Sequence, residues 1–187
     1  YSSVTISTLD VPGLFSMITG VMAANGISIL GAQIYTRKNG TALDILHVNK
    51  PVGGVIDSAS KWQKVQSDLT AVLEGRIKVS SLVRKRQKAS TLTAPQMPRY
   101  PNQVEFDCDV SREHTVIDIF AHDKVGLLYR ITRTLADLGL YIHVAKISTK
   151  VDQVADTFYV KDIFGQPINS EAKREDIREA LLECLKE

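Results

Sequence analysis

The feature that most constrains this 187-residue chain is that one stretch of it occurs twice. Residues 5–36 and 118–149 align at an offset of 113 positions, and 12 of the 32 aligned pairs are identical. An internal repeat determines the number of folding units in a chain. A period of this length is too long for a solenoid repeat. The sequence therefore predicts two copies of one small domain, each near the lower size limit for a self-sufficient core.

The first copy shows four short segments of alternating apolar residues and two of helical spacing. In chain order we expect a strand at 4–8, a helix at 13–25, strands at 27–36 and 43–48, a helix at 58–73 and a strand at 77–83. Gly26 and Gly75 would end the two helices as left-handed residues. The order βαββαβ is the ferredoxin-like arrangement. The predicted class is α+β, with two such domains, each an antiparallel four-stranded sheet with two helices on one face.

The second copy begins its first strand at Thr115, and its last helix, at 170–186, leaves no residues for a fourth strand. An open sheet edge is a liability, so we expect the alternating segment 103–107 to supply that strand. A basic run and three prolines lie between the copies and are typical of an extended linker. The predicted domains are 1–84 and 103–187, joined by a linker at 85–102.

The second strand of each copy changes the parity of its apolar residues. Ile27 and Ile29 occupy odd positions in the first copy, whereas Ala32 and Ile34 occupy even ones, and the second copy repeats the change. A shift of one residue moves side chains to the opposite face of a sheet. We therefore predict a bulge at 30–32 and another at 143–145.

Composition excludes several classes of protein. The net charge of +2 argues against a strongly basic nucleic-acid module, and no apolar run is long enough to span a membrane. Two cysteines far apart are typical of a cytoplasmic chain with free thiols. The four histidines lack metal-ligand spacing, and no nucleophile–base pair or phosphate-binding loop occurs. We expect no catalytic residue, metal or cofactor in this stretch, which starts at Tyr1 and reads as a fragment.

Both copies carry the same junction between strand and helix, D-V-P-G at 10–13 and D-K-V-G at 123–126. Glycine permits a tight turn, and the first amides of a helix attract an anion. A carboxylate in the same loop would receive an ammonium group, so the junction suits a zwitterionic amino acid. A simpler interpretation is that the aspartate caps the helix and the glycine only permits the turn.

The junction, followed by G-I-x-I-x-x-A-x-I-x-T and a short hairpin, resembles the ACT domain, a small regulatory fold that binds amino acids. The pair is similar to the C-terminal region of the bifunctional protein-PII uridylyltransferases/uridylyl-removing enzymes. The most specific stretches are V-E-F-D at 104–107 and A-D-T-F-Y-V-K-D-I-F-G-Q-P-I at 155–168. The chain departs from the family at Val125, where proline is usual.

The resemblance implies a regulatory region without catalysis of its own. It would sense an amino acid, glutamine above all, and control uridylylation and deuridylylation of a PII signal protein by upstream nucleotidyltransferase and phosphohydrolase domains. The resemblance implies Mg²⁺ in those catalytic domains. Homodimerisation is expected. Neither a nucleic acid nor a membrane is expected as a partner. The alternatives are a protein-interaction module without a ligand, and a tandem ACT region of another amino-acid-controlled enzyme. The predicted ligand-binding residues are Asp10, Pro12, Gly13, Leu14, Ser28, Ile29, Asp123, Gly126, Leu127, Tyr141 and Ile142.

Overall fold

The first copy forms three strands and three helices in the computed structural model, which describes residues 1–51, 53–90, 101–107, 110–150 and 153–186. Its elements are β1 (Ser2–Leu9), α1 (Leu14–Ala24), β2 (Ser28–Thr36), β3 (Thr41–Asn49), α2 (Ala59–Leu73) and α3 (Val79–Ser90). Gly26 and Gly75 follow α1 and α2 with positive φ, which confirms both predicted helix ends.

The second copy consists of β4 (Gln103–Asp107), β5 (Thr115–His122), α4 (Leu127–Asp137), β6 (Tyr141–Lys146), β7 (Thr149–Lys150), β8 (Gln153–Lys161) and α5 (Glu171–Lys186). The predicted outer strand is confirmed, because β4 pairs antiparallel with β5 and places Val104 opposite Ile119. Both of these side chains are buried. The segment before the second repeat thus completes its four-stranded sheet, with β7 as a short extra hairpin strand on β8.

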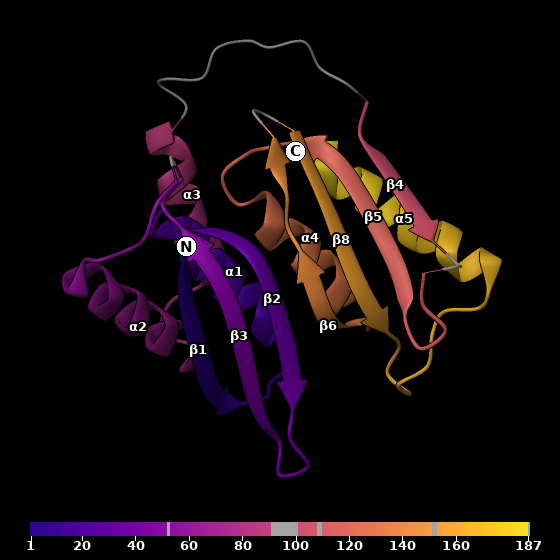
Figure 1. Cartoon of the computed structure of the whole chain (residues 1–187), viewed down its shortest axis with the longest axis horizontal. Helices are drawn as coiled ribbons and strands as arrows, with labels where there is room; N and C mark the ends of the chain where they lie inside the picture. Colours follow the sequence, from indigo (N-terminus) through magenta and orange to yellow (C-terminus); the bar gives the residue numbers. More distant parts are fainter. Residues whose placement is uncertain (52, 91–100, 108–109, 151–152, 187) are drawn as a thin grey trace.

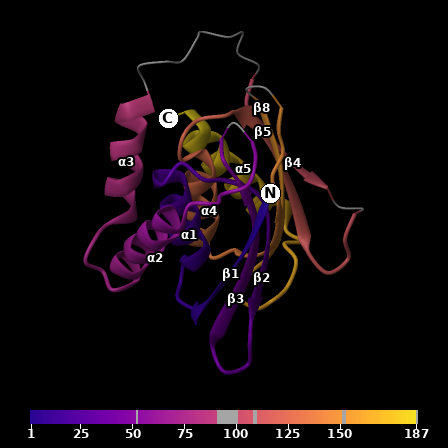
Figure 2. The same ribbon diagram turned by 60° about the vertical axis from the view of Figure 1, so that its left-hand side comes forward.

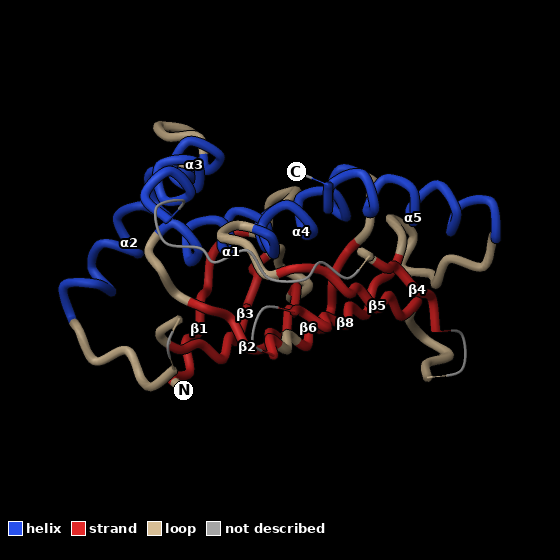
Figure 3. The backbone as a smooth tube through the Cα atoms, turned by 90° about the horizontal axis from the view of Figure 1, so that it is seen from above, coloured by secondary structure: helices blue, strands red, loops and turns tan. Residues whose placement is uncertain are grey.

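The predicted fourth strand of the first copy, at 77–83, is wrong. Val79, Leu82 and Val83 recur at helical spacing, and residues 79–90 form α3, which packs on α1. The first unit therefore has three strands, and α3 lies outside α1, away from the sheet (Figures 2 and 3). Residues 85–90, expected in the linker, are helical. Residues 91–100 of that linker lie outside the described residues.

Both predicted bulges are confirmed. The pairing of β2 with β3 shifts register between Ile29 and Gly31, and that of β6 with β8 shifts between Ile142 and Val144. Each strand thus changes the face that it buries partway along its length. As a result, the alternation of side chains between the two faces of the sheet differs between the beginning and the end of β2, and likewise of β6.

The two sheets join edge to edge into one sheet with the order β1-β3-β2-β6-β8-β5-β4, and the helices cover one face (Figures 1 and 3). The seam is the antiparallel pairing of β2 with β6, in which Ala32 lies opposite Ala145. Above the seam, the hydroxyls of Thr19 and Thr132 are 3.0 Å apart between α1 and α4. Both pairs are separated by 113 residues, the period of the repeat, so the copies are related by a two-fold axis.

The hydroxyl contact on this axis gives a first prediction. Thr19→Val and Thr132→Val are each expected to lower the free energy of unfolding by about 1 kcal/mol, because each removes one buried hydrogen-bond partner. The double variant should lose less than the sum, with a coupling of about 0.5–1.5 kcal/mol in urea denaturation. Thr70→Val on the exposed side of α2 is the control. Additive losses would contradict the contact.

Candidate functional site

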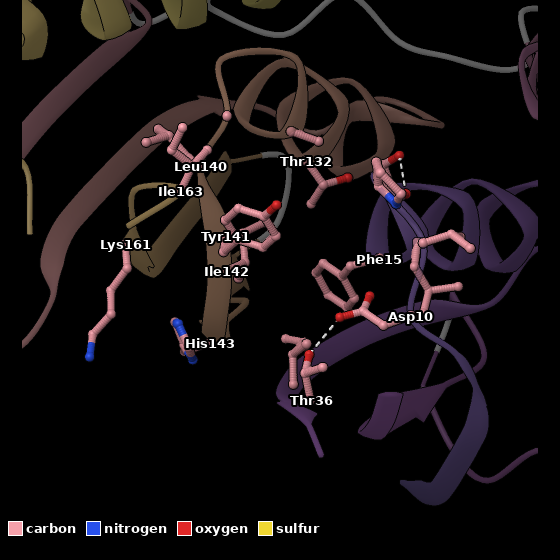
Figure 4. A pocket seen from close by; sticks show the side chains of 18 of the residues that line it. Asp10, Phe15, Thr36, Thr132, Leu140, Tyr141, Ile142, His143, Lys161 and Ile163 are labelled. Atoms are coloured by element: carbon pink, nitrogen blue, oxygen red, sulfur yellow. Dashed lines mark hydrogen bonds between the residues drawn. The ribbon is translucent and has the colours of Figure 1, made fainter. Parts of the chain in front are cut away.

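A cavity of about 520 Å³ lies between the two copies, where the loop before α1 meets the beginning of β6. Figure 4 shows Asp10 and Phe15 of the first copy facing Tyr141 of the second across this space. Its volume falls in the range of small-molecule sites. Six of the predicted residues line it together: Asp10, Pro12, Gly13, Leu14, Tyr141 and Ile142. Neither copy forms this cavity alone.

The other five predicted residues do not line this cavity. Asp123, Gly126 and Leu127 form the equivalent junction before α4, and Ser28 and Ile29 begin β2 in the first copy. Helix α3 lies over that junction, with Val83 directly against Gly126. The repeat predicts two equivalent sites, and the structure makes them unequal.

Gly13 begins α1 in the left-handed region, at φ 74°, so the glycine is required for the turn. The Leu14 amide donates to the Val11 carbonyl at 3.0 Å. The amides that remain to face an anion are therefore those of Phe15 and Ser16, in the first turn of the helix. Both residues line the cavity.

Asp10 does not cap the helix, so the capping part of the simpler interpretation is wrong, whereas Gly13 does permit the turn. None of the described side chains caps α1, and the hydroxyl of Thr36 donates to Asp10 Oδ2 at 2.6 Å (Figure 4). The carboxylate is thereby held over the cavity from the side of β2. The equivalent helix α4 also lacks a side-chain cap at Gly126.

The most informative residue of the cavity, Asp44 on β3, is not among the predicted ligand-binding residues. It is 1% exposed, and neither of its carboxylate oxygens has a hydrogen-bond partner among the described residues. Its neighbours across the ladders are Ile6 and Ile34. Burial, and then the nearby Asp10 carboxylate, raises the pKa of Asp44 from 3.8 to about 7. A buried acid without a partner marks a place where a cation would be stabilised.

The sequence does contain a signal for this residue. On β3 the even positions are buried, so Asp44 interrupts an otherwise apolar face formed by Ala42, Leu46 and Val48. The second copy repeats the interruption at Asp156, which is 2% exposed and whose pKa burial raises to about 7. A charged residue at the same core position in both repeats points to a role other than packing.

The opposite wall of the cavity is mixed in character. Tyr141, Ile142 and Leu140 provide apolar surface, and Lys161 and His143 bring nitrogen atoms to the rim (Figure 4). Burial, followed by His114 and Lys161, lowers the pKa of His143. The cavity thus combines an acidic floor, helix amides and an apolar wall, which together suit a small molecule carrying both an ammonium and a carboxylate.

The described residues contain neither a membrane-spanning helix nor a cluster of metal-ligand side chains. No three His, Cys, Asp or Glu side chains of that part of the chain gather as metal ligands would. None of the helices described above is long and apolar enough to cross a membrane.

Comparison with known proteins agrees with this architecture. A family model described as an ACR9-like, ACT-like domain matches residues 103–187. A bifunctional uridylyltransferase/uridylyl-removing enzyme of Azospirillum brasilense is 40% identical over 98% of the chain, and that of Rhodospirillum rubrum is 39% identical over 96%. The chain spans about a fifth of the length of these relatives, 20% and 19%. Residues 103–187 therefore match the ACT-like domain family, and the chain as a whole is similar to one region of the bifunctional uridylyltransferase/uridylyl-removing enzymes.

Proposed function

We propose that this chain is a regulatory region that binds a free amino acid, with glutamine as the ligand, in the cavity between its two copies. The observation that carries the proposal is Asp44, a buried carboxylate that has no hydrogen-bond partner within the described part of the chain and lies at the floor of a cavity that both copies line. An ammonium group placed between Asp44 and Asp10 would neutralise two neighbouring acids. Such a charge-assisted contact in a buried site contributes about 1.5–3 kcal/mol.

The remaining groups of the ligand have matching partners. Its carboxylate would meet the amides of Phe15 and Ser16, where the partial positive charge of the α1 N-terminus lies. Its side chain would point across the seam toward Tyr141 and Ile142. Because the ligand would touch both copies, its binding would favour one mutual arrangement of them over others, which is the physical requirement for control.

The relatives' names suggest what is controlled. We propose that the ligand biases the remainder of a longer protein between attaching and removing uridylyl groups on a PII signal protein. Full-length protein with intact catalytic regions would show this as a glutamine-dependent change in the ratio of the two activities. A region that only mediates protein contacts would leave that ratio unchanged by glutamine.

The binding test compares the two junctions by isothermal titration of glutamine into the chain. Asp10→Asn is expected to weaken binding about tenfold to a hundredfold, since it removes one charged partner of the ammonium group. Asp123→Asn, the matched change in the other copy, should leave the affinity at the wild-type value. Titration of glutamate and serine sets the specificity. Equal affinity of wild type and Asp10→Asn would exclude this cavity as the site.

A further inference from the structure

Strand β1 forms one edge of the sheet, opposite β4, and its outer side is unpaired among the described strands (Figure 1). The Asp10 amide donates to the Gly40 carbonyl, just before β3, at 2.9 Å. Because alternate residues of a strand hydrogen-bond to alternate sides, the amides of Ser3, Thr5 and Ser7 point away from β3, toward the open edge. Over its eight residues β1 carries no charge, proline or bulge, the features that usually keep an edge from pairing. This edge is therefore open to a further strand.

The same edge is occupied in the second unit. Strand β5, the counterpart of β1, pairs with β8 on one side and with β4 on the other. The outer side of β4 is itself protected, because this strand is short and carries Glu105 and Asp107. In addition, Arg178 Nε of α5 donates to the Val104 carbonyl of β4 at 3.2 Å. One end of the sheet is thus closed, and the other end, at β1, is not.

The second helices of the two units, α2 and α5, dock in the same way. The indole nitrogen of Trp62 on α2 donates to the Ile56 carbonyl at 3.3 Å. At the same place on α5, Arg174 Nε donates to the Ile168 carbonyl at 2.8 Å. A difference in burial beneath α2 and α5 therefore does not come from the placement of these helices.

Such a difference exists, because three apolar side chains are fully buried in the second unit but only partly buried in the first. They are Ile117, Ile119 and Leu181, at 0% exposed, and their counterparts are Val4, Ile6 and Leu69. Strand β4 accounts for the difference, since it packs against α5 and places Phe106 opposite Ile117 and Val104 opposite Ile119. The first unit presents the same apolar surface between β1 and α2 without the strand that covers it.

We propose that one further strand pairs antiparallel with the outer side of β1, and that the polypeptide preceding Tyr1 in a longer protein supplies it. The repeat supports this source, because β4 lies upstream of β5 and the positions that correspond to β4 lie before Tyr1. The relatives are long enough, since the chain spans 20% of the Azospirillum brasilense enzyme. The added strand would carry apolar residues at alternate positions, packed against α2 as β4 is packed against α5.

A strand in this position would connect the remainder of the protein to the cavity. Strand β1 runs directly into the junction at Asp10, and its Ile6 lies opposite Asp44 at the cavity floor. The pairing itself does not depend on the ligand, so this inference and the proposed function can fail separately.

The first test supplies the missing strand from the chain itself. A copy of residues 103–114 replaces Tyr1, which gives the copy the same spacing to β1 that the original has to β5. The control protein carries the same copy with Val104→Ser and Phe106→Ser in it, which removes the side chains that would cover the apolar surface. Thermal unfolding establishes that both proteins fold. Amide hydrogen exchange, followed by NMR under reducing conditions, then reports whether the edge is paired.

The copied strand should slow exchange at Ser3, Thr5 and Ser7 about tenfold or more, because each amide gains a backbone hydrogen-bond partner. The control should exchange at these positions like the unmodified chain. Amides of β8, in the other unit, should exchange equally in all three proteins. Exchange at Ser3, Thr5 and Ser7 as fast with the copied strand as in the control overturns the inference.

The second test identifies the natural source of the strand. In the full-length protein, a peptide covering residues 2–9 should exchange more slowly, by mass spectrometry, than the same peptide of the 187-residue chain. Equal exchange in the two proteins overturns the assignment to the preceding polypeptide. Protection that rises with the concentration of the 187-residue chain, together with a dimer in sedimentation, overturns it as well and identifies a second copy as the occupant.

Discussion

Replacing Asp44 with Asn is expected to make the ligand-free protein more stable above neutral pH while weakening its binding of an amino acid. The folded-state pKa of Asp44 lies near 7, above the value of 3.8 for an unperturbed carboxyl. The folded state therefore holds a proton that the unfolded state has released, and stability falls as pH rises from about 4 to about 7. Asparagine carries no charge at any pH and does not undergo this loss.

The expected size follows from the width of that window. One pKa unit corresponds to about 1.4 kcal/mol, so the stability difference between Asp44→Asn and wild type should grow by up to about 4 kcal/mol between about pH 4 and about pH 8. Urea denaturation at both pH values measures it. Asp156→Asn should behave alike. Asp57→Asn should not, because a backbone hydrogen bond and Lys50 lower the pKa of Asp57. Parallel pH profiles of Asp44→Asn and wild type would contradict the prediction.

The same variant should bind glutamine about tenfold to a hundredfold more weakly at about pH 8, since the ammonium group loses a charged partner. Opposite effects on stability and binding would distinguish Asp44 from a residue that only packs, where both would fall together. Functional sites commonly retain groups that are unfavourable to folding. An unchanged affinity together with a gain in stability would remove Asp44 from the site.

The second large effect is expected at Gly126. Alanine there should lower the free energy of unfolding by about 2–5 kcal/mol, from about 1–2 kcal/mol of left-handed backbone strain and about 1–3 kcal/mol of overpacking against Val83. Gly13→Ala is the matched control, because it has the same strain but its new Cβ would meet Ser16 Oγ only at 3.4 Å, and it should lose only about 1–2 kcal/mol. Urea denaturation compares the two.

Val83→Ala should recover the excess loss of Gly126→Ala, because it removes the methyl group that the new Cβ would meet. A double-mutant cycle separates this recovery from the cost of the Val83→Ala change itself. Equal losses at Gly13 and Gly126 would show that α3 does not press on the second junction in solution.

Much of the fold could be predicted because it is encoded in local patterns. The parity change around Leu30 and His143 predicted both bulges, and the alternation at 103–107 predicted β4. The run at 77–83 was misassigned, since a short apolar run fits both a strand and a helix. The helix is favoured by a tertiary contact, because Val79 fits into the space at Gly20, which is distant in sequence. No local pattern reveals that contact.

Only part of the candidate site could be predicted from the sequence, for a related reason. The repeat identified both junctions, but it treats the copies as equals, and only the tertiary structure shows that one is covered. The pairing of β2 with β6 brings Asp10 and Tyr141 to the same cavity. This pairing could not be predicted from the sequence, because the residues at its centre, Ala32 and Ala145, are small and carry no distinctive pattern. The sequence shows Asp44 as an acid in an otherwise apolar alternation, but only the structure shows that it lines a cavity and is therefore a candidate for binding a ligand.

The meeting of equivalent residues across one axis, Ala32 with Ala145 and Thr19 with Thr132, is the geometry of an isologous dimer whose two subunits share one polypeptide. In a dimer of identical chains every substitution near the axis is made twice, and both binding sites change in step. Joining the subunits removes that constraint. Position 20 can therefore be glycine while its counterpart is Arg133, and only the first half makes room for a helix such as α3.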